Sequence, residues 1–133
     1  MRFLFLAAIA ALFFVSAPEA TAQDVEVEFI SDTNDARVVH GKYYRIRFNV
    51  INTGASDIRG GVFVTFDVPG GGQFTRRVEN TVLRAGESRE YRFKELFRPT
   101  APLGQYGVTV TFEEIDRSAV LSSNAVSVRV VAS

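Results

Sequence analysis

The 133-residue chain contains no cysteine, no tryptophan, one histidine and only four prolines. Without cysteine it can form no disulfide framework, thiol nucleophile, lipid-modified thiol or thiolate metal site. One histidine is too few for a multi-histidine metal site. The 15 basic and 15 acidic side chains cancel, whereas a nucleic-acid partner calls for a basic excess. We therefore expect no catalytic residues, no cofactor, no metal and no nucleic-acid partner.

The first 22 residues have the features of a cleaved signal peptide. Arg2 precedes an unbroken apolar run from Phe3 to Val15. As a helix this run would reach only about 20 Å, which is short of the ~30 Å hydrocarbon core of a membrane. The small-x-small sequence Ala20–Ala22 then supplies a cleavage site. The sequence predicts export to the periplasm or the cell exterior, with a domain over 23–133; an uncleaved anchor is the alternative.

Apolar and polar residues alternate with a period of two over most of 23–133. This pattern places one face of a strand in a core and the other face in water. It is clear in five segments, whose inward-facing residues are Val25, Val27 and Phe29; Tyr44, Ile46, Phe48 and Val50; Val62, Val64, Phe66 and Val68; Tyr106, Val108, Val110 and Phe112; and Val126, Val128 and Val130. Weaker strands over 74–82 and 87–94 bring the expected number to about seven.

Turn-forming residues separate these segments, at 52–54, 69–72, 85–86, 99–104 and 116–124. Glycine, proline, asparagine and aspartate favour such turns. No stretch has the apolar spacing of an amphipathic helix. About seven short strands over ~110 residues predict an all-β, antiparallel sandwich, and a closed barrel is the competing architecture.

Four segments carry a resemblance to a known family: YRIRFNVINTG (44–54), GGVFVTFDV (60–68), LRAGESREYRF (83–93) and LGQYGVTVTF (103–112). They resemble CARDB domains (cell-adhesion-related domains found in bacteria) and the immunoglobulin-like accessory domains of some glycoside hydrolases. Those families share an Asn-x-Gly turn, a Leu-x-x-Gly-Glu-Ser approach to a later strand, and a Gly-x-Tyr strand start, matched here by Gly104 and Tyr106. The resemblance implies a single immunoglobulin-like β-sandwich domain.

Two groups of residues could in principle support catalysis. His40 could act as a general base at neutral pH, but we expect it to be a turn histidine. Glu113, Glu114 and Asp116 could supply the paired carboxylates of a glycoside hydrolase. On a strand, however, Glu113 and Glu114 point to opposite faces, so we interpret them as a solvated strand end.

One loop is rich in oxygen ligands. Asp32, Asn34 and Asp35 could contribute to a Ca²⁺ site, although their spacing does not match an EF-hand. Aspartate and asparagine are also common in turns, because their side chains cap backbone N–H groups. The sequence leaves both interpretations open.

Many cations fall on strand faces that should point outward: Lys42, Arg45, Arg47, Arg76, Arg77, Arg89, Arg92 and Lys94. We expect cross-strand ion pairs, with Glu26 and Glu28 of the first strand beside Arg45 and Arg47 of the second. The alternative is a surface for a polyanion or a glycan.

Two aromatic residues also fall on outward faces, namely Tyr43 and Phe63. Exposed aromatic side chains often mark contact surfaces, although packing under a loop is an equally good explanation. Together with Arg45 and Arg47 they form the candidate binding surface of the sequence analysis.

These features favour a non-catalytic module, exported to the periplasm or beyond the cell, that binds another envelope or secreted protein or a surface glycan. Binding would use strand faces, an edge strand, or the loops Asn52–Arg59 and Asp116–Asn124. An inhibitor of a secreted peptidase is the alternative. A small hydrolase is the remote alternative, because the sequence shows no nucleophile–base or metal constellation. Oligomeric state stays open.

Overall fold

The computed structural model describes residues 24–30, 36–116 and 118–133, which form strands, turns and loops without any helix. None of these residues therefore belongs to a helix that could cross a membrane. The expected signal peptide (1–22) and the Asp32–Asp35 loop lie outside the described residues. The eight strands are β1 Val25–Phe29, β2 Ala36–Val39, β3 Tyr43–Asn52, β4 Ile58–Asp67, β5 Gln73–Leu83, β6 Ser88–Leu96, β7 Gly104–Glu114 and β8 Ala119–Val131.

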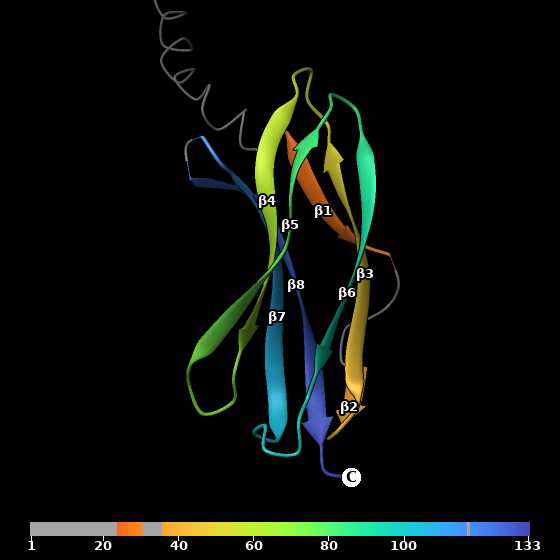
Figure 1. The fold of residues 1–133 in the computed structure, drawn as a ribbon, viewed down its shortest axis with the longest axis vertical. Coiled ribbons are helices and arrows are strands. Elements are labelled where there is room, and N and C mark those ends of the chain that lie inside the picture. Colours follow the sequence, from red (N-terminus) through yellow and green to blue (C-terminus); the bar gives the residue numbers. More distant parts are fainter. Residues whose placement is uncertain (1–23, 31–35, 117) are drawn as a thin grey trace, which may run out of the picture.

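These strands form two sheets, one of three strands in the order β1-β3-β6 and one of five in the order β2-β8-β7-β4-β5. The strands run along the long axis of the molecule, and the five-stranded sheet is strongly twisted (Figure 1). Every pairing is antiparallel except that of β2 with β8. The prediction of an all-β structure is confirmed, whereas the parallel pairing of β2 with β8 departs from the antiparallel arrangement that the sequence predicted.

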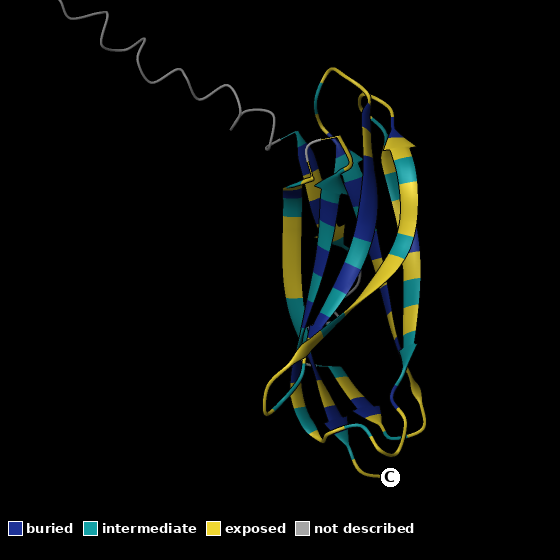
Figure 2. Cartoon of the chain, turned by 60° about the vertical axis from the view of Figure 1, so that its left-hand side comes forward, coloured by how far each residue is buried: buried dark blue, intermediate teal, exposed yellow. Residues whose placement is uncertain are grey.

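The core lies between the two sheets and consists of the residues that the period-two pattern turns inward. Nine of them are 0% exposed, namely Phe48, Val50, Val62, Val64, Phe66, Val108, Val110, Phe112 and Val128. Buried and exposed residues alternate along the strands (Figure 2). Burial of each such side chain contributes about 1.5–3 kcal/mol to stability, so the alternation accounts for most of the driving force for folding.

An aromatic cluster joins the two sheets at one end of the core. The Phe66 ring of β4 stacks on Phe74 of β5, with 4.8 Å between the ring centroids. It also meets Tyr44 of β3 at 6.3 Å and Phe93 of β6 at 6.2 Å. Phe97, which follows β6, lies edge-on to Phe66 at 5.9 Å. Such ring pairs contribute beyond their buried area and fix the separation of the sheets.

Three strand assignments differ from the sequence prediction. Strand β2 was not expected, because four residues are too few to establish a pattern. Strand β4 begins at Ile58, inside the expected Asn52–Arg59 loop, and β8 begins at Ala119, inside the expected Asp116–Asn124 loop. The early part of β8 is polar because it passes the rim of the core beside β1, where the Asn124 side-chain amide donates a hydrogen bond to the Val27 carbonyl (3.2 Å).

Two buried tyrosines differ in how their hydroxyl groups are satisfied. The Tyr106 hydroxyl donates a 2.7 Å hydrogen bond to the Pro102 carbonyl. The Tyr44 hydroxyl is buried and has no hydrogen-bond partner among the described residues, and this burial raises the pKa of Tyr44 far above its usual value. The first hydroxyl should therefore stabilise the fold, whereas the second should not.

We predict that Tyr106→Phe lowers the free energy of unfolding by about 1 kcal/mol, the typical net contribution of such a hydrogen bond. Tyr44→Phe should leave stability unchanged or raise it, because it removes a buried hydroxyl without a partner. Urea unfolding of the two variants at neutral pH tests this contrast, and equal losses would contradict it.

Above pH 10, the unfolded chain ionises at its tyrosines while folded Tyr44 keeps its proton. The ionisation of Tyr44 should therefore leave the free energy of unfolding unchanged below pH 10, and this free energy should fall as the pH rises above 10. Tyr44→Phe should make this alkaline loss shallower, which thermal melts between pH 8 and 12 would show.

Candidate functional site

The exposed face of the three-stranded sheet carries a cluster of cations, which we call the basic array: Arg45, Arg47, Arg92 and Lys94. Alternation along β3 and β6 turns these residues outward, while their neighbours Ile46 and Phe93 face the core. The antiparallel register places Arg45 opposite Lys94 and Arg47 opposite Arg92. Two pairs of like charges therefore lie directly across from each other, an arrangement that destabilises a sheet.

Only one half of the basic array has an ion-pair partner, and its two arginines share a single carboxylate. One carboxylate oxygen of Glu90 accepts hydrogen bonds from Nε of Arg47 (3.0 Å) and Nε of Arg92 (3.2 Å), and these contacts lower the pKa of Glu90. Arg45 and Lys94 form no ion pair with any other described residue.

Tyr43 is the aromatic neighbour of the unneutralised half. Its ring lies 4.6 Å from Nζ of Lys94 and 5.5 Å from Cζ of Arg45. Such cation–π contacts hold the cations without cancelling their charge. Tyr43 as a whole is 45% exposed. The basic array borders an open hollow of about 380 Å³ on this face.

The predicted pairing of Glu26 and Glu28 with Arg45 and Arg47 is wrong. Strand β1 does lie beside β3, but the register sets Glu26 opposite Ile51 and Glu28 opposite Asn49. The last residue of β1, Phe29, lies opposite Phe48, so β1 ends before it reaches Arg45. The acidic and basic residues consequently occupy different ends of one face.

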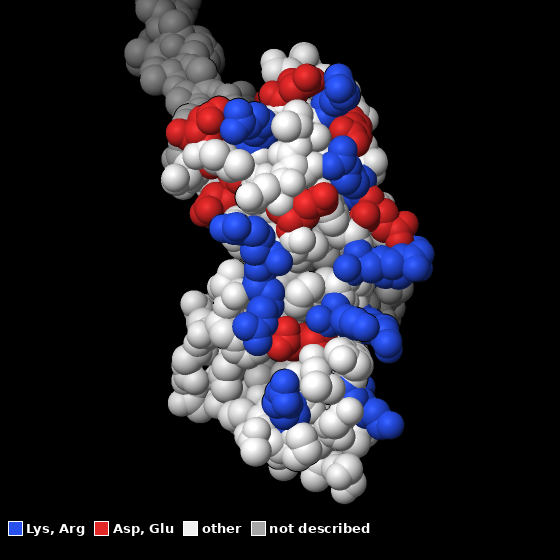
Figure 3. Space-filling model, in the orientation of Figure 1, with Lys and Arg blue, Asp and Glu red and all other residues white. Residues whose placement is uncertain are grey.

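Charge is unevenly distributed over the face shown in Figure 3. Most of its acidic side chains lie in the upper part, where basic side chains stand among them, whereas lysine and arginine predominate in the middle and lower parts. One basic residue outside the array is strongly paired: Arg76 of β5 forms two 3.0 Å hydrogen bonds with Glu95 of β6, which raise the pKa of Arg76. This ion pair joins the facing edges of the two sheets.

Phe63 does not belong to the basic array, because it lies on β4 in the other sheet. It is half-buried, and its ring covers Gly61: a Cβ placed on that glycine would lie 2.8 Å from the ring. The Arg77 guanidinium covers the ring from above, 5.8 Å from its centroid. The structure thus brings together three of the four predicted surface residues and gives Phe63 a packing role.

The other candidate residues are dispersed. Nε2 of His40 lies 2.9 Å from the Ala101 carbonyl and ties a turn to a loop. Glu113 and Glu114 border an open hollow of about 320 Å³ that also includes Phe63. Within the described ranges, no group of three histidine or acidic residues could hold a metal ion. The proposed calcium ligands lie outside those ranges.

Asn52 organises the loop after β3. Its side-chain amide donates to the Ser56 carbonyl (2.8 Å) and the Leu83 carbonyl (3.1 Å), and its Oδ1 accepts from the Gly54 N–H (2.9 Å). Its backbone N–H donates to Glu87, and its carbonyl accepts from Gly86. The residue is fully buried. The Asn-x-Gly motif therefore has a structural role and does not present Asn52 to a partner.

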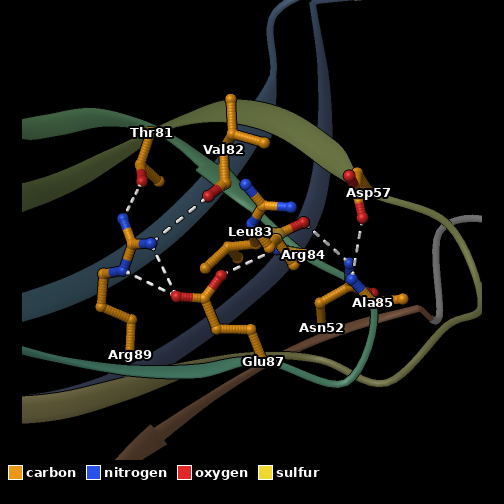
Figure 4. A network of polar contacts seen from close by, with 9 residues as sticks. All are labelled: Asn52, Asp57, Thr81, Val82, Leu83, Arg84, Ala85, Glu87 and Arg89. Carbon is orange, nitrogen blue, oxygen red and sulfur yellow. Dashed lines mark hydrogen bonds and ion pairs between the residues drawn. The ribbon is translucent and has the colours of Figure 1, made fainter.

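The same network continues onto the facing edges of β5 and β6 (Figure 4). Glu87 accepts hydrogen bonds from the Arg84 N–H (2.8 Å) and from the Arg89 guanidinium (2.6 Å), which together lower the pKa of Glu87. Arg89 also donates to the Thr81 hydroxyl and to the Val82 carbonyl. These contacts hold the start of β6 against the end of β5.

Sequence reasoning had noted Arg92 and Lys94 as outward-facing cations but could not place them beside Arg45 and Arg47. That placement depends on the register between β3 and β6. The sequence feature that could have indicated this register is the pair of turns at 52–54 and 85–86. In the structure these turns are joined by a hydrogen bond from the Gly86 N–H to the Asn52 carbonyl.

No protein-family model matches the chain, and no curated protein matches its sequence. Solved structures do match its fold. Part of the Pseudomonas fluorescens alkylpurine DNA glycosylase AlkC, bound to DNA containing an abasic-site analogue, superposes with a TM-score of 0.66 at 13% identity, over 98% of this chain and 41% of that chain. The sporulation control protein Spo0M from Bacillus subtilis gives 0.61 at 12% identity, over 83% and 50%.

A Niemann-Pick type C2 protein from the Japanese carpenter ant is also similar, with a TM-score of 0.57 at 7% identity, over 81% of this chain and 89% of that chain. The chain spans half or less of the glycosylase and of the sporulation protein. At these identities the likeness shows the fold alone.

We predict that Asn52→Ala lowers the free energy of unfolding by about 3 kcal/mol, because it leaves buried backbone groups without partners. The matched control is Asn49→Ala on the solvent side of the same strand, which should stay within about 0.5 kcal/mol of the wild type. Urea unfolding measures both variants. A loss no larger for Asn52→Ala than for the control would contradict the role given to Asn52.

We also predict that Lys94→Glu raises stability by several tenths of a kcal/mol, since it converts the Arg45–Lys94 opposition into a cross-strand ion pair. The gain should shrink in 1 M salt, where exposed charges are screened. Thermal melts at low and high salt measure it. A salt-independent loss of stability would show that the opposition of like charges is not the governing term.

Proposed function

We propose that residues 23–133 form an exported, non-catalytic, immunoglobulin-like β-sandwich that binds an anionic polymer of the cell surface through Tyr43 and the basic array. Export rests on the signal-peptide features of residues 1–22. The chain contains no cysteine and a single histidine, and this shortage of nucleophiles and bases supports a binding role over a catalytic one.

Two observations favour the immunoglobulin-like assignment. The sheet order, with β2 parallel to the last strand β8, divides the chain into the two layers of such a sandwich. The hydrogen bond from Tyr106 at the start of β7 to the Pro102 carbonyl four residues upstream resembles the tyrosine corner of that fold. Both features agree with the resemblance to CARDB domains.

The basic array is the observation that carries the proposed activity. Glu90 bridges Arg47 and Arg92, but the opposition of Arg45 and Lys94 has no carboxylate and reduces the stability of the sheet. Replacing either Arg45 or Lys94 with an acidic residue would remove that opposition. Residues that lower stability are typical of functional sites. A ligand that supplies the missing negative charge would account for the arrangement.

The spacing of the array favours a repeating anion over a single small one. Residues two apart on a strand lie about 6.6 Å apart, and opposed residues on neighbouring strands lie about 5 Å apart. Each guanidinium can form two parallel hydrogen bonds to a carboxylate, sulfate or phosphate group. A polymer with successive anionic groups would engage both rows of the array, and Tyr43 would pack against its backbone.

The two alternative functions have less support. A peptidase inhibitor that used the Asn52–Thr53–Gly54 turn would need this turn to be accessible, but Asn52 is buried and Gly54 packs against Asp24 so closely that a Cβ would lie 2.7 Å from its carboxyl carbon. For a hydrolase, the hollow beside Glu113 and Glu114 is open, and Nε2 of His40, the candidate base, lies 2.9 Å from the Ala101 carbonyl, which is not a nucleophile.

The test is calorimetric titration of the purified chain with heparin, a sulfated polymer, at physiological ionic strength. We expect measurable binding that weakens as salt increases, because the contacts are ionic. Arg45→Glu combined with Lys94→Glu should weaken binding at least about tenfold, the effect of 1.4 kcal/mol.

The matched control is Arg37→Glu combined with Arg129→Glu. These two arginines also lie side by side, on β2 and β8 of the other sheet, and their reversal changes net charge by the same amount. It should alter affinity only slightly. Equal losses of affinity in the two double variants, or no heparin binding by the wild type, would reject the proposed site. Capture of an acidic protein without any polymer binding would reject the proposal that the ligand is a polymer.

A further inference from the structure

The outer face of the three-stranded sheet is divided into a basic half and an acidic half. Its outward-facing residues form five rows that run across the strands. Counted from one end, the rows are Tyr43 and Leu96; Arg45 and Lys94; Arg47 and Arg92; Asn49, Glu90 and Glu28; and Ile51, Ser88 and Glu26. All cations of this grid fall in the second and third rows, and all carboxylates in the fourth and fifth. The face is therefore electrically polarised along the strands.

We propose that this face binds a second copy of the chain in an antiparallel orientation. A two-fold axis in the plane of the face, perpendicular to the strands and between the third and fourth rows, reverses the strand direction of the partner. It places Arg47 and Arg92 of one copy opposite the row of Glu28 and Glu90 of the other. The row of Arg45 and Lys94 then meets the row of Glu26.

The contact is isologous, because the same surface serves both copies and each basic half meets an acidic half. A two-fold axis parallel to the strands would instead bring basic onto basic and is disfavoured. In the isolated chain Arg45 and Lys94 have no carboxylate partner among the described residues. In the antiparallel pair, the facing row of the second copy brings one carboxylate, Glu26, to within one strand of Arg45 and two strands of Lys94, without any change of fold.

The size of the face determines how strong the contact can be. Three strands about 4.8 Å apart and nine residues at about 3.3 Å each cover roughly 400 Å² per copy. The total, about 800 Å², is below the roughly 1,200–2,000 Å² of stable interfaces. The pair should therefore be transient, concentration-dependent and sensitive to salt.

Self-association and polymer binding would use the same array. The inference goes beyond the proposed function, because it assigns a role to Glu26 and Glu28, which the polymer does not touch. It also predicts that an anionic polymer releases the paired copies, since both compete for Arg45 and Lys94.

The test is sedimentation velocity of the purified chain over a concentration series. At about 0.01 M ionic strength, where the Debye length is about 30 Å, the sedimentation coefficient should rise with concentration; at about 1 M it should return to the monomer value. An acidic-half variant, Glu26→Lys with Glu28→Lys, and a basic-half variant, Arg45→Glu with Lys94→Glu, should each remain monomeric.

Mixing the two variants provides the decisive measurement. The acidic-half variant keeps only Glu90 among the carboxylates of the face and is mostly basic, whereas the basic-half variant is mostly acidic. The equimolar mixture should therefore associate at low salt although neither variant does alone. Because all four positions are exposed, misfolding is not expected, and circular dichroism of each variant checks it.

A monomeric wild type at low salt, association of either variant alone, or a mixture that stays monomeric would overturn the proposal. Heparin binding separates this failure from failure of the proposed function. The acidic-half variant should bind heparin as well as or better than the wild type, whether or not copies associate.

Discussion

Asn52 is the one buried polar residue in the described part of the chain, and five hydrogen bonds satisfy its side chain and backbone. Two of these bonds join the end of β3 to the turn that starts β6. They fix the register between the two strands at one end, and the pairing of Tyr43 with Leu96 completes it at the other. A slip by one residue would turn every side chain of one strand to the opposite face. The core and the basic array both depend on this register.

The register also has an energetic consequence at the surface. Inward, it brings Phe48 against Tyr91, with ring centroids 5.7 Å apart, and so contributes to the core. Outward, the same alignment opposes Arg45 to Lys94 and Arg47 to Arg92. The core gain, of the order of several kcal/mol for aromatic side chains, exceeds the few tenths of a kcal/mol lost between exposed like charges. The fold can therefore maintain an unneutralised array that a ligand or a second copy would stabilise.

The facing edges of the two sheets are held by a different set of interactions. Arg76 with Glu95 and Arg89 with Thr81 connect β5 to β6 through side chains, where no backbone pairing exists between them. Charged residues along β5 also guard an open edge against pairing with other chains. Arg76 and Arg89 therefore stabilise the fold, whereas Arg45 and Lys94 form no ion pair with the described residues.

Local pattern determined much of this protein. Alternation predicted the all-β class and the inward residues of β3, β4, β7 and the end of β8, because burial of one strand face requires a period of two whatever the strand pairs with. It did not reveal β2, or the polar start of β8, since neither buries a continuous apolar face. Tertiary structure alone decided which outward residues meet. Glu26 and Glu28 were expected beside Arg45 and Arg47, but register and strand length, which no single strand encodes, placed them at the other end of the face and left the basic array open.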